Sequence, residues 1–209
     1  MANYVFNAAK ELLMKGHINL TTADFDGSSI TEASDLTYNS LSSAGAEFRV
    51  LLIKSGSTLT TAGETNGSID AIDCATMDDI TTLNEVSSTS GYTPFNDASG
   101  SGNGGDSDGV LASMTVTKVD DGDGASYTKW DAADVTFNNI GSGSTIEGFL
   151  IVWSKATPTN AGSNAGEKPA NATSQIPLVW IDISSNPIST NGGDIEIVWA
   201  GDGIMRLNA

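Results

Sequence analysis

The stretch TIEGFLIVWSK, residues 145–155, decides the fold because it is apolar on both faces of an extended chain. Both alternating sets of positions carry large apolar side chains: Ile146, Leu150 and Val152 on one, Phe149, Ile151 and Trp153 on the other. Successive side chains of a strand point to opposite faces, so both faces of this strand must be covered. It therefore belongs in the middle of a sandwich or barrel.

The rest of the last third of the chain continues this strand pattern. Residues 176–184 (IPLVWIDIS) are again apolar on both faces, whereas residues 194–199 (DIEIVW) alternate between acidic and apolar side chains. Residues 200–203 (AGDG) suit a tight hairpin that needs a positive φ, and residues 204–207 are predicted to return from it. Four strands in a row indicate a core, with nothing catalytic in it.

Length and charge exclude several classes of protein. The 209 residues suffice for one domain with a real core, and 26 acidic against 9 basic residues give a formal net charge of −17. Phosphate-backbone binding needs clustered basic residues, so no nucleic-acid partner is expected. No apolar run reaches membrane-spanning length, and the N-terminus lacks the pattern of a signal peptide. The single cysteine, Cys74, excludes an intrachain disulfide framework.

Residues 3–15 (NYVFNAAKELLMK) predict a short N-terminal helix. Val5, Ala9, Leu12 and Leu13 recur at three- and four-residue spacing and make one apolar stripe. Such a stripe must be buried, across an open end or face of the sheet or against a neighbouring subunit. These four residues are therefore the interface candidates.

The remaining segments complete an all-β prediction for one domain, residues 1–209. Further strands are expected at 47–55, 110–119, 126–131 and 135–140, and one helical turn at 76–83 with Met77 and Ile80 inward. Long polar loops are expected near 21–45, 98–109 and 156–174. Antiparallel hairpins with short turns indicate a β-sandwich or flattened barrel, a jelly-roll-like arrangement included, with the one short helix.

Candidate chemistry is sparse. Asp120, Asp121 and Asp123 resemble the start of a calcium loop, but they are bunched where alternating ligands are needed, and a hairpin turn explains the segment as well. His17, the only histidine, has no acidic partner nearby for nucleophilic catalysis. Cys74 lies among small and apolar residues, which indicates a structural thiol. The sequence therefore predicts no enzyme, no cofactor and no metal beyond the weak calcium candidates.

Several segments, taken in order, resemble a group of small tailed-phage virion proteins. They are ANYVFNAAKELLMKGHINL (2–20), EFRVLLIKS (47–55), YTKWDAADVTFNNI (127–140), IEGFLIVWSK (146–155), PLVWIDIS (177–184) and ISTNGGDIEIVWAGDGIMRLN (188–208). The similar segments cover about half of the chain, mostly as framework. The chain departs from the group in its longer polar stretches, which bear on its exact location on the particle.

The resemblance implies a structural protein of the virion, a head decoration or cement protein on the capsid surface, made in the host cytoplasm. The implied partners are the major capsid protein and the chain itself, as a homotrimer, with no nucleic acid and no membrane. Another virion component, of the neck, tail or fibre, is the alternative. A carbohydrate-binding or hydrolytic β-sandwich is a third reading. It would stack sugars on Trp130, Trp153, Trp180 and Trp199, but three of these lie on apolar strands and suit a core better.

Overall fold

A computed structural model describes the parts of the chain that form the sheets and their covering segments. The described residues are 3–14, 20, 47–59, 65–66, 69–87, 92, 94, 109–120, 126–154, 172 and 175–208. The predicted loops at 21–45, 98–109 and 156–174 lie outside them, apart from residues 109 and 172. Within these ranges the chain forms antiparallel sheets and a single α-helix, which confirms the expected all-β class.

The central sheet is built around the stretch that opened the sequence analysis. Its members are β1 (Tyr4–Val5), β2 (Glu47–Lys54), β8 (Thr145–Ser154), β9 (Gln175–Asp182) and β10 (Ile188–Ser189). β8 pairs with β2 on one side and β9 on the other, β1 extends the sheet beyond β9, and β10 pairs with the first residues of β8. All pairs are antiparallel.

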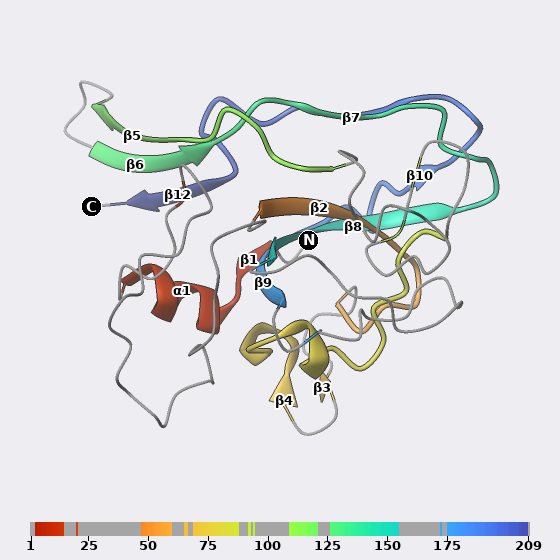
Figure 1. The fold of residues 1–209 in the computed structure, drawn as a ribbon, viewed down its shortest axis with the longest axis horizontal. Coiled ribbons are helices and arrows are strands. Elements are labelled where there is room, and N and C mark those ends of the chain that lie inside the picture. Colours follow the sequence, from red (N-terminus) through yellow and green to blue (C-terminus); the bar gives the residue numbers. More distant parts are fainter. Residues whose placement is uncertain are drawn as a thin grey trace.

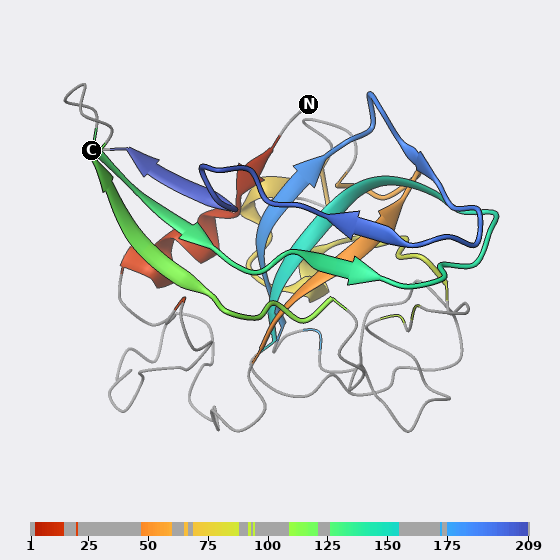
Figure 2. The ribbon, with the colours of Figure 1, turned by 90° about the horizontal axis from the view of Figure 1, so that it is seen from above.

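A second β layer lies over one face of the central sheet (Figures 1 and 2). It consists of β5 (Thr115–Asp120), β6 (Ser126–Asp131), β7 (Val135–Phe137), β11 (Ile195–Ile197) and β12 (Met205–Asn208). The strand orders are β12-β6-β5 and β11-β7. Because β6 leads into β7 and β11 into β12, the layer is one long antiparallel ribbon with β5 along one side.

The turn at residues 200–203 does not form the predicted hairpin. Gly203 N–H donates to Ala200 O at 2.8 Å and Gly203 has φ +81°, so the predicted tight turn with a positive φ is present. The strands that flank it pair elsewhere, β11 with β7 and β12 with β6. Before the turn the chain pairs with β7, and after it the chain pairs with β6, which directly precedes β7. Residues 198–204 therefore bulge out opposite residues 131–134. The local sequence predicts that the chain turns, but it does not predict with which strand the following segment pairs.

The strand expected from residue 110 starts later than predicted. Val110 makes only a single bridge with Arg49, and Ser113 has φ +53°, which interrupts the extended chain before Thr115. The expected β2 and β6 segments, in contrast, are strands over almost their whole predicted length.

Helical segments cover the other face of the central sheet. They are α1 (Asn7–Met14) and two 3-10 turns, η1 (Ala71–Asp73) and η2 (Met77–Asp79); a small hairpin of β3 (Thr65–Asn66) and β4 (Ile69–Asp70) precedes the turns. α1 and η2 both contact β9. Met77 and Ile80 are fully buried, as predicted. With a layer on each side, both faces of β8 and β9 are covered, which is why these strands are apolar throughout.

The N-terminal helix begins four residues later than predicted. Tyr4 and Val5 pair with Trp180 and Val179 of β9 instead of forming the first helical turn. Asn3, the first residue of the predicted helix, accepts a hydrogen bond through Oδ1 from the Asp182 backbone N–H at 2.9 Å. Aromatic and β-branched residues favour strands, and the unpaired edge of β9 supplies the partner that a local helix prediction cannot see.

The apolar stripe of the helix is buried by the chain itself. Ala9 and Leu12 keep 0% and 4% of their accessible surface, and Val5 and Leu13 are half-buried against the same core. Ala9 and Leu12 therefore do not need a neighbouring subunit to leave water, because the chain's own core buries them. Val5 and Leu13 keep part of their surface exposed, and the role of the four residues in an interface stays a prediction.

Close packing in the core depends on a glycine of β8. A Cβ built on Gly148 would lie 2.0 Å from Cη2 of Trp180, so the absence of a side chain there makes room for the indole. Trp130, Trp153 and Trp180 are all buried, which confirms that they are core residues. Within the described ranges, no helix has both the length and the apolar composition that a membrane crossing demands.

Candidate functional site

Of the calcium candidates, the structure describes Asp120 alone. It is the last residue of β5 and pairs with Ser126 of β6. Asp121, Asp123 and the single histidine, His17, lie outside the described residues. In the part of the chain that the structure describes, no group of three or more His, Cys, Asp or Glu side chains could hold a metal ion.

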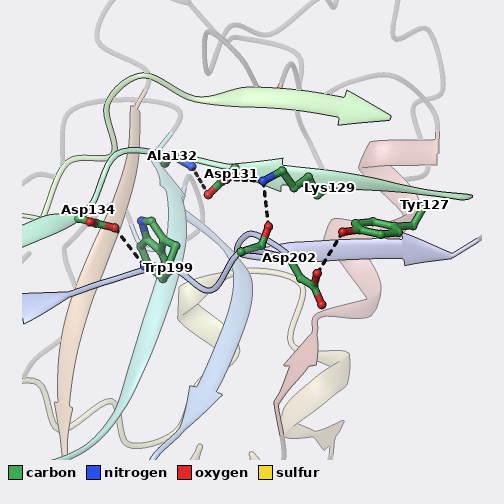
Figure 3. A network of polar contacts seen from close by, with 8 residues as sticks. Tyr127, Lys129, Asp131, Ala132, Asp134, Trp199 and Asp202 are labelled. Carbon is green, nitrogen blue, oxygen red and sulfur yellow. Dashed lines mark hydrogen bonds and ion pairs between the residues drawn. The ribbon is translucent and has the colours of Figure 1, made fainter. Parts of the chain in front are cut away.

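The main polar feature of the ribbon is a network on the outer face of β6 and β12, shown in Figure 3. We call it the ribbon network; it comprises Tyr127, Lys129, Asp131, Asp202 and Arg206. Tyr127, Lys129 and Asp131 are alternate residues of β6 and therefore share a face. Arg206 of β12 is the register partner of Lys129 and joins the same face, while Trp130 points to the core.

Arg206 is held from two sides at one end of the network. Its guanidinium carbon lies 3.8 Å from the centroid of the Tyr127 ring, and its Nη1 lies 3.2 Å from Asp202 Oδ2. The Tyr127 hydroxyl donates to Asp202 Oδ1 at 3.0 Å. This hydrogen bond to a carboxylate, more than the carboxylate's charge, raises the pKa of Tyr127 above its ordinary value.

Lys129 is held at the other end. Its Nζ lies 2.9 Å from Asp131 Oδ2 and 3.0 Å from the carbonyl oxygen of Gly201. The hydrogen bond to Asp131 raises the pKa of Lys129. Lys129 and Arg206 face each other across the strands, an arrangement that is unfavourable for two cations, and the two aspartates offset their repulsion. The network therefore ties the 200–203 turn to β6 and presents an ordered, exposed surface of mixed charge.

The half-buried Trp199 belongs to the same turn region. Its indole Nε1 donates to Ala133 O at 3.0 Å, and its backbone N–H donates to Asp134 Oδ1 at 3.1 Å. These bonds fasten the bulge to the segment between β6 and β7, and Figure 3 shows the one between Trp199 and Asp134. Trp199 lies at the margin of the core, where it is only partly buried.

A second polar cluster is buried at the outer edge of β2. The Tyr92 hydroxyl accepts a hydrogen bond from the Leu52 N–H at 3.2 Å and donates one to Glu85 Oε1. Burial, and then the Glu85 carboxylate, raise the pKa of Tyr92 well above its ordinary value. Sequence reasoning missed this cluster, because Glu85 and Tyr92 stand in a segment without strand or helix periodicity.

Backbone groups complete the cover of that edge. Val50 N–H donates to Gly109 O at 2.8 Å, and Val86 N–H donates to Leu52 O at 2.8 Å. The Tyr92 hydroxyl thus stands in the ladder between two backbone segments, in the place of a carbonyl oxygen. A long apolar strand with a bare edge invites aggregation, and this arrangement closes it.

Formal charge is distributed unevenly over the chain. Three basic and three acidic residues belong to β5, β6 and β12 together with Asp202, which lies in the turn before β12. They are Lys118, Lys129, Arg206, Asp120, Asp131 and Asp202. The rest of the chain keeps 23 acidic and 6 basic residues and so carries the whole net charge of −17. The β5-β6-β12 sheet with Asp202 therefore sums to zero formal charge in a strongly acidic protein.

Comparison with protein-family models, with curated protein sequences and with solved structures found no match for this chain.

Proposed function

We propose that the chain is a structural protein of a tailed-phage virion, a head decoration protein that binds the outer capsid surface and stabilises it. The observation that carries the proposal is where the similar segments lie. Residues 47–55, 146–155 and 177–184 coincide with β2, β8 and β9 of the central sheet. Residues 127–140 and 188–208 supply most of the ribbon above it. The resemblance thus falls on one connected framework of two β layers, for which we favour a sandwich over a flattened barrel.

The charge of the chain suits a surface with basic groups as partner. With 26 acidic and 9 basic residues, the protein is repelled by other copies and attracted by cationic surfaces or bridging cations. We expect the major capsid protein to provide such groups where capsomers meet. Many copies on a symmetric shell bind with avidity, so each single contact can be weak.

Self-association accompanies this role. The resemblance implies a homotrimer, which stays a prediction. The helix stripe is not needed for it, because Ala9 and Leu12 are already buried. The exposed surfaces of the ribbon, including the ribbon network, are better placed to meet a neighbour, since arginine and tyrosine are enriched in protein interfaces.

The test is to add the purified, tagged protein to phage particles that lack it. Electron microscopy of labelled particles should show density at regular positions on the head. Occupancy should fall as ionic strength rises if the contact is to basic groups, and on chelation if cations bridge. Label on the neck, tail or fibres would favour the alternative virion role. No binding to any part of the particle at any salt concentration would contradict the proposal.

A further inference from the structure

β5 is the outermost strand of the β12-β6-β5 sheet, as Figure 2 shows. It pairs with β6 along its whole length, from Thr115 opposite Asp131 to Asp120 opposite Ser126. On its other side no strand pairs with it among the described residues. Its residues 115–118 are all exposed, and Val116 retains 45% of its accessible surface. Among the described residues, β5 is therefore unpaired on one edge, and its residues 115–118 are exposed.

The outer edge of β2 is covered, whereas the outer edge of β5 is not covered by any described residue. Residues 84–86, residues 109–111 and the Tyr92 hydroxyl cover the outer edge of β2. β5 has no such cover within the described ranges, although four of its five first residues are the β-branched side chains that favour strands. A strand with little core contact gains most from a second strand at its edge, the arrangement known as β-augmentation.

We propose that β5 pairs antiparallel with β5 of a second copy of this chain, about a two-fold axis at Thr117. In a two-fold antiparallel pair the facing side chains must point to the same face, so the axis passes through a residue. An axis at Lys118 would place two lysines opposite each other, which is unfavourable. An axis at Thr117 places Thr117 opposite Thr117 and Thr115 opposite Val119, all β-branched residues on the outer face.

The inner face of this register is also favourable. Val116, which points the same way as its buried register partner Trp130, comes to lie opposite Lys118 of the second copy. The aliphatic part of the lysine can cover the exposed valine while its ammonium group stays in water. The register therefore covers the apolar side chain that the single chain leaves exposed.

Charge indicates that the occupant is a second copy and not a basic partner. The β5-β6-β12 sheet and Asp202 together have three acidic and three basic residues, while the rest of the chain carries the net charge of −17. Two copies repel each other least where they meet through this neutral region. A basic partner would be attracted electrostatically by the acidic remainder of the chain, and it would gain no electrostatic attraction by binding at β5.

Two consequences follow from the geometry. Each β5 has one free edge, so the pair is closed at two copies, and a trimer requires a different surface. The contact is one strand wide and falls below the area of a stable interface, so we expect dissociation constants of roughly 0.1–1 mM in solution. Salt should strengthen the pair because it screens the repulsion between acidic chains, the opposite of its effect on binding to basic groups.

The experiment is a charge-exchange test at the axis. The parent, Thr117→Glu and Thr117→Lys are each studied by sedimentation velocity up to about 1 mM protein, the upper end of the expected dissociation range, at low and high salt. Thr136→Lys, an exposed threonine at the centre of β7, is the matched control. Circular dichroism and thermal unfolding establish that each variant is folded. The parent and the control should dimerise, each Thr117 variant should associate at least about tenfold more weakly, and their equimolar mixture should recover the dimer.

The pairing would be refuted if the parent stayed monomeric at every concentration, or if both Thr117 variants associated as strongly as the parent. It would also be refuted if the mixture of the two variants failed to form the dimer, or if the sedimenting species had the mass of three copies. Loss of particle binding by the Thr117 variants, with a monomeric parent, would show instead that β5 receives a strand of the shell. The pairing is independent of the proposed function: a dimer that binds no particle refutes only the latter, and a monomer that decorates heads refutes only the former.

Discussion

Replacing Gly148 with alanine should destabilise the protein more than any ordinary glycine-to-alanine change in a strand. The added Cβ would lie 2.0, 2.4 and 2.7 Å from Cη2, Cζ2 and Cζ3 of Trp180, where ordinary contacts are 3.4–4 Å. The ring must therefore retreat by about 1.4 Å, yet Trp180 has no exposed surface, and protein cores are close-packed.

The magnitude follows from two opposing effects. Overpacking of a filled core costs about 1–3 kcal/mol, and a rigid indole in contact with backbone belongs at the upper end. Alanine gains back about 0.5–1 kcal/mol because glycine loses more backbone freedom on folding. The net loss should be about 2 kcal/mol, which lowers the melting temperature of a chain of this size by roughly 4–8 °C.

Urea unfolding followed by circular dichroism measures this loss. Gly201→Ala is the matched control, because no atom lies within 4 Å of its added Cβ and its φ is not positive; its change should stay within about 0.5 kcal/mol. A smaller residue at position 180 should remove the clash. Gly148→Ala should therefore cost about 1 kcal/mol less in a Trp180→Leu background than in the parent. An unchanged urea midpoint for Gly148→Ala alone would refute the packing argument.

Three further changes probe the polar groups. Tyr92→Phe should cost about 1–3 kcal/mol in urea unfolding, because it deprives the buried Leu52 N–H and Glu85 carboxylate of their shared hydroxyl; a neutral result would contradict the role of Tyr92 in the β2 ladder. Tyr4→Phe should be neutral or stabilising, since the buried Tyr4 hydroxyl has no hydrogen-bond partner among the described residues. Burial raises the pKa of both tyrosines. The folded state is therefore not penalised by these groups below pH 10, and it loses stability as pH rises above 10, where the unfolded chain ionises first. Tyr4→Phe should make this alkaline loss shallower. Asp202→Asn should lower the pKa of Tyr127 toward its ordinary value in an ultraviolet titration, with little change in stability; an unmoved titration would contradict the hydrogen bond.

Local patterns were sufficient for the strands that the core buries. The apolar run at residues 47–55 and the two-faced stretch at 145–155 lie within 1–2 residues of β2 and β8, because only a covered strand tolerates apolar side chains on both faces. Met77 and Ile80, predicted to point inward from one helical turn, are fully buried. The argument against a nucleic-acid partner rests on the acidic composition alone and stays a prediction.

Pairing was decided only by the tertiary structure. Nothing local shows that Tyr4 and Val5 extend the edge of β9 instead of starting a helix, or that β11 and β12 follow β7 and β6 across a bulge. The ribbon network depends on the register that sets Arg206 opposite Lys129, and the Tyr92 cluster on a segment without periodicity. A residue's neighbours in sequence determine its preference for strand or turn. Its partner across a sheet can be more than a hundred residues away, and the choice is made by the burial and hydrogen bonding of the whole chain.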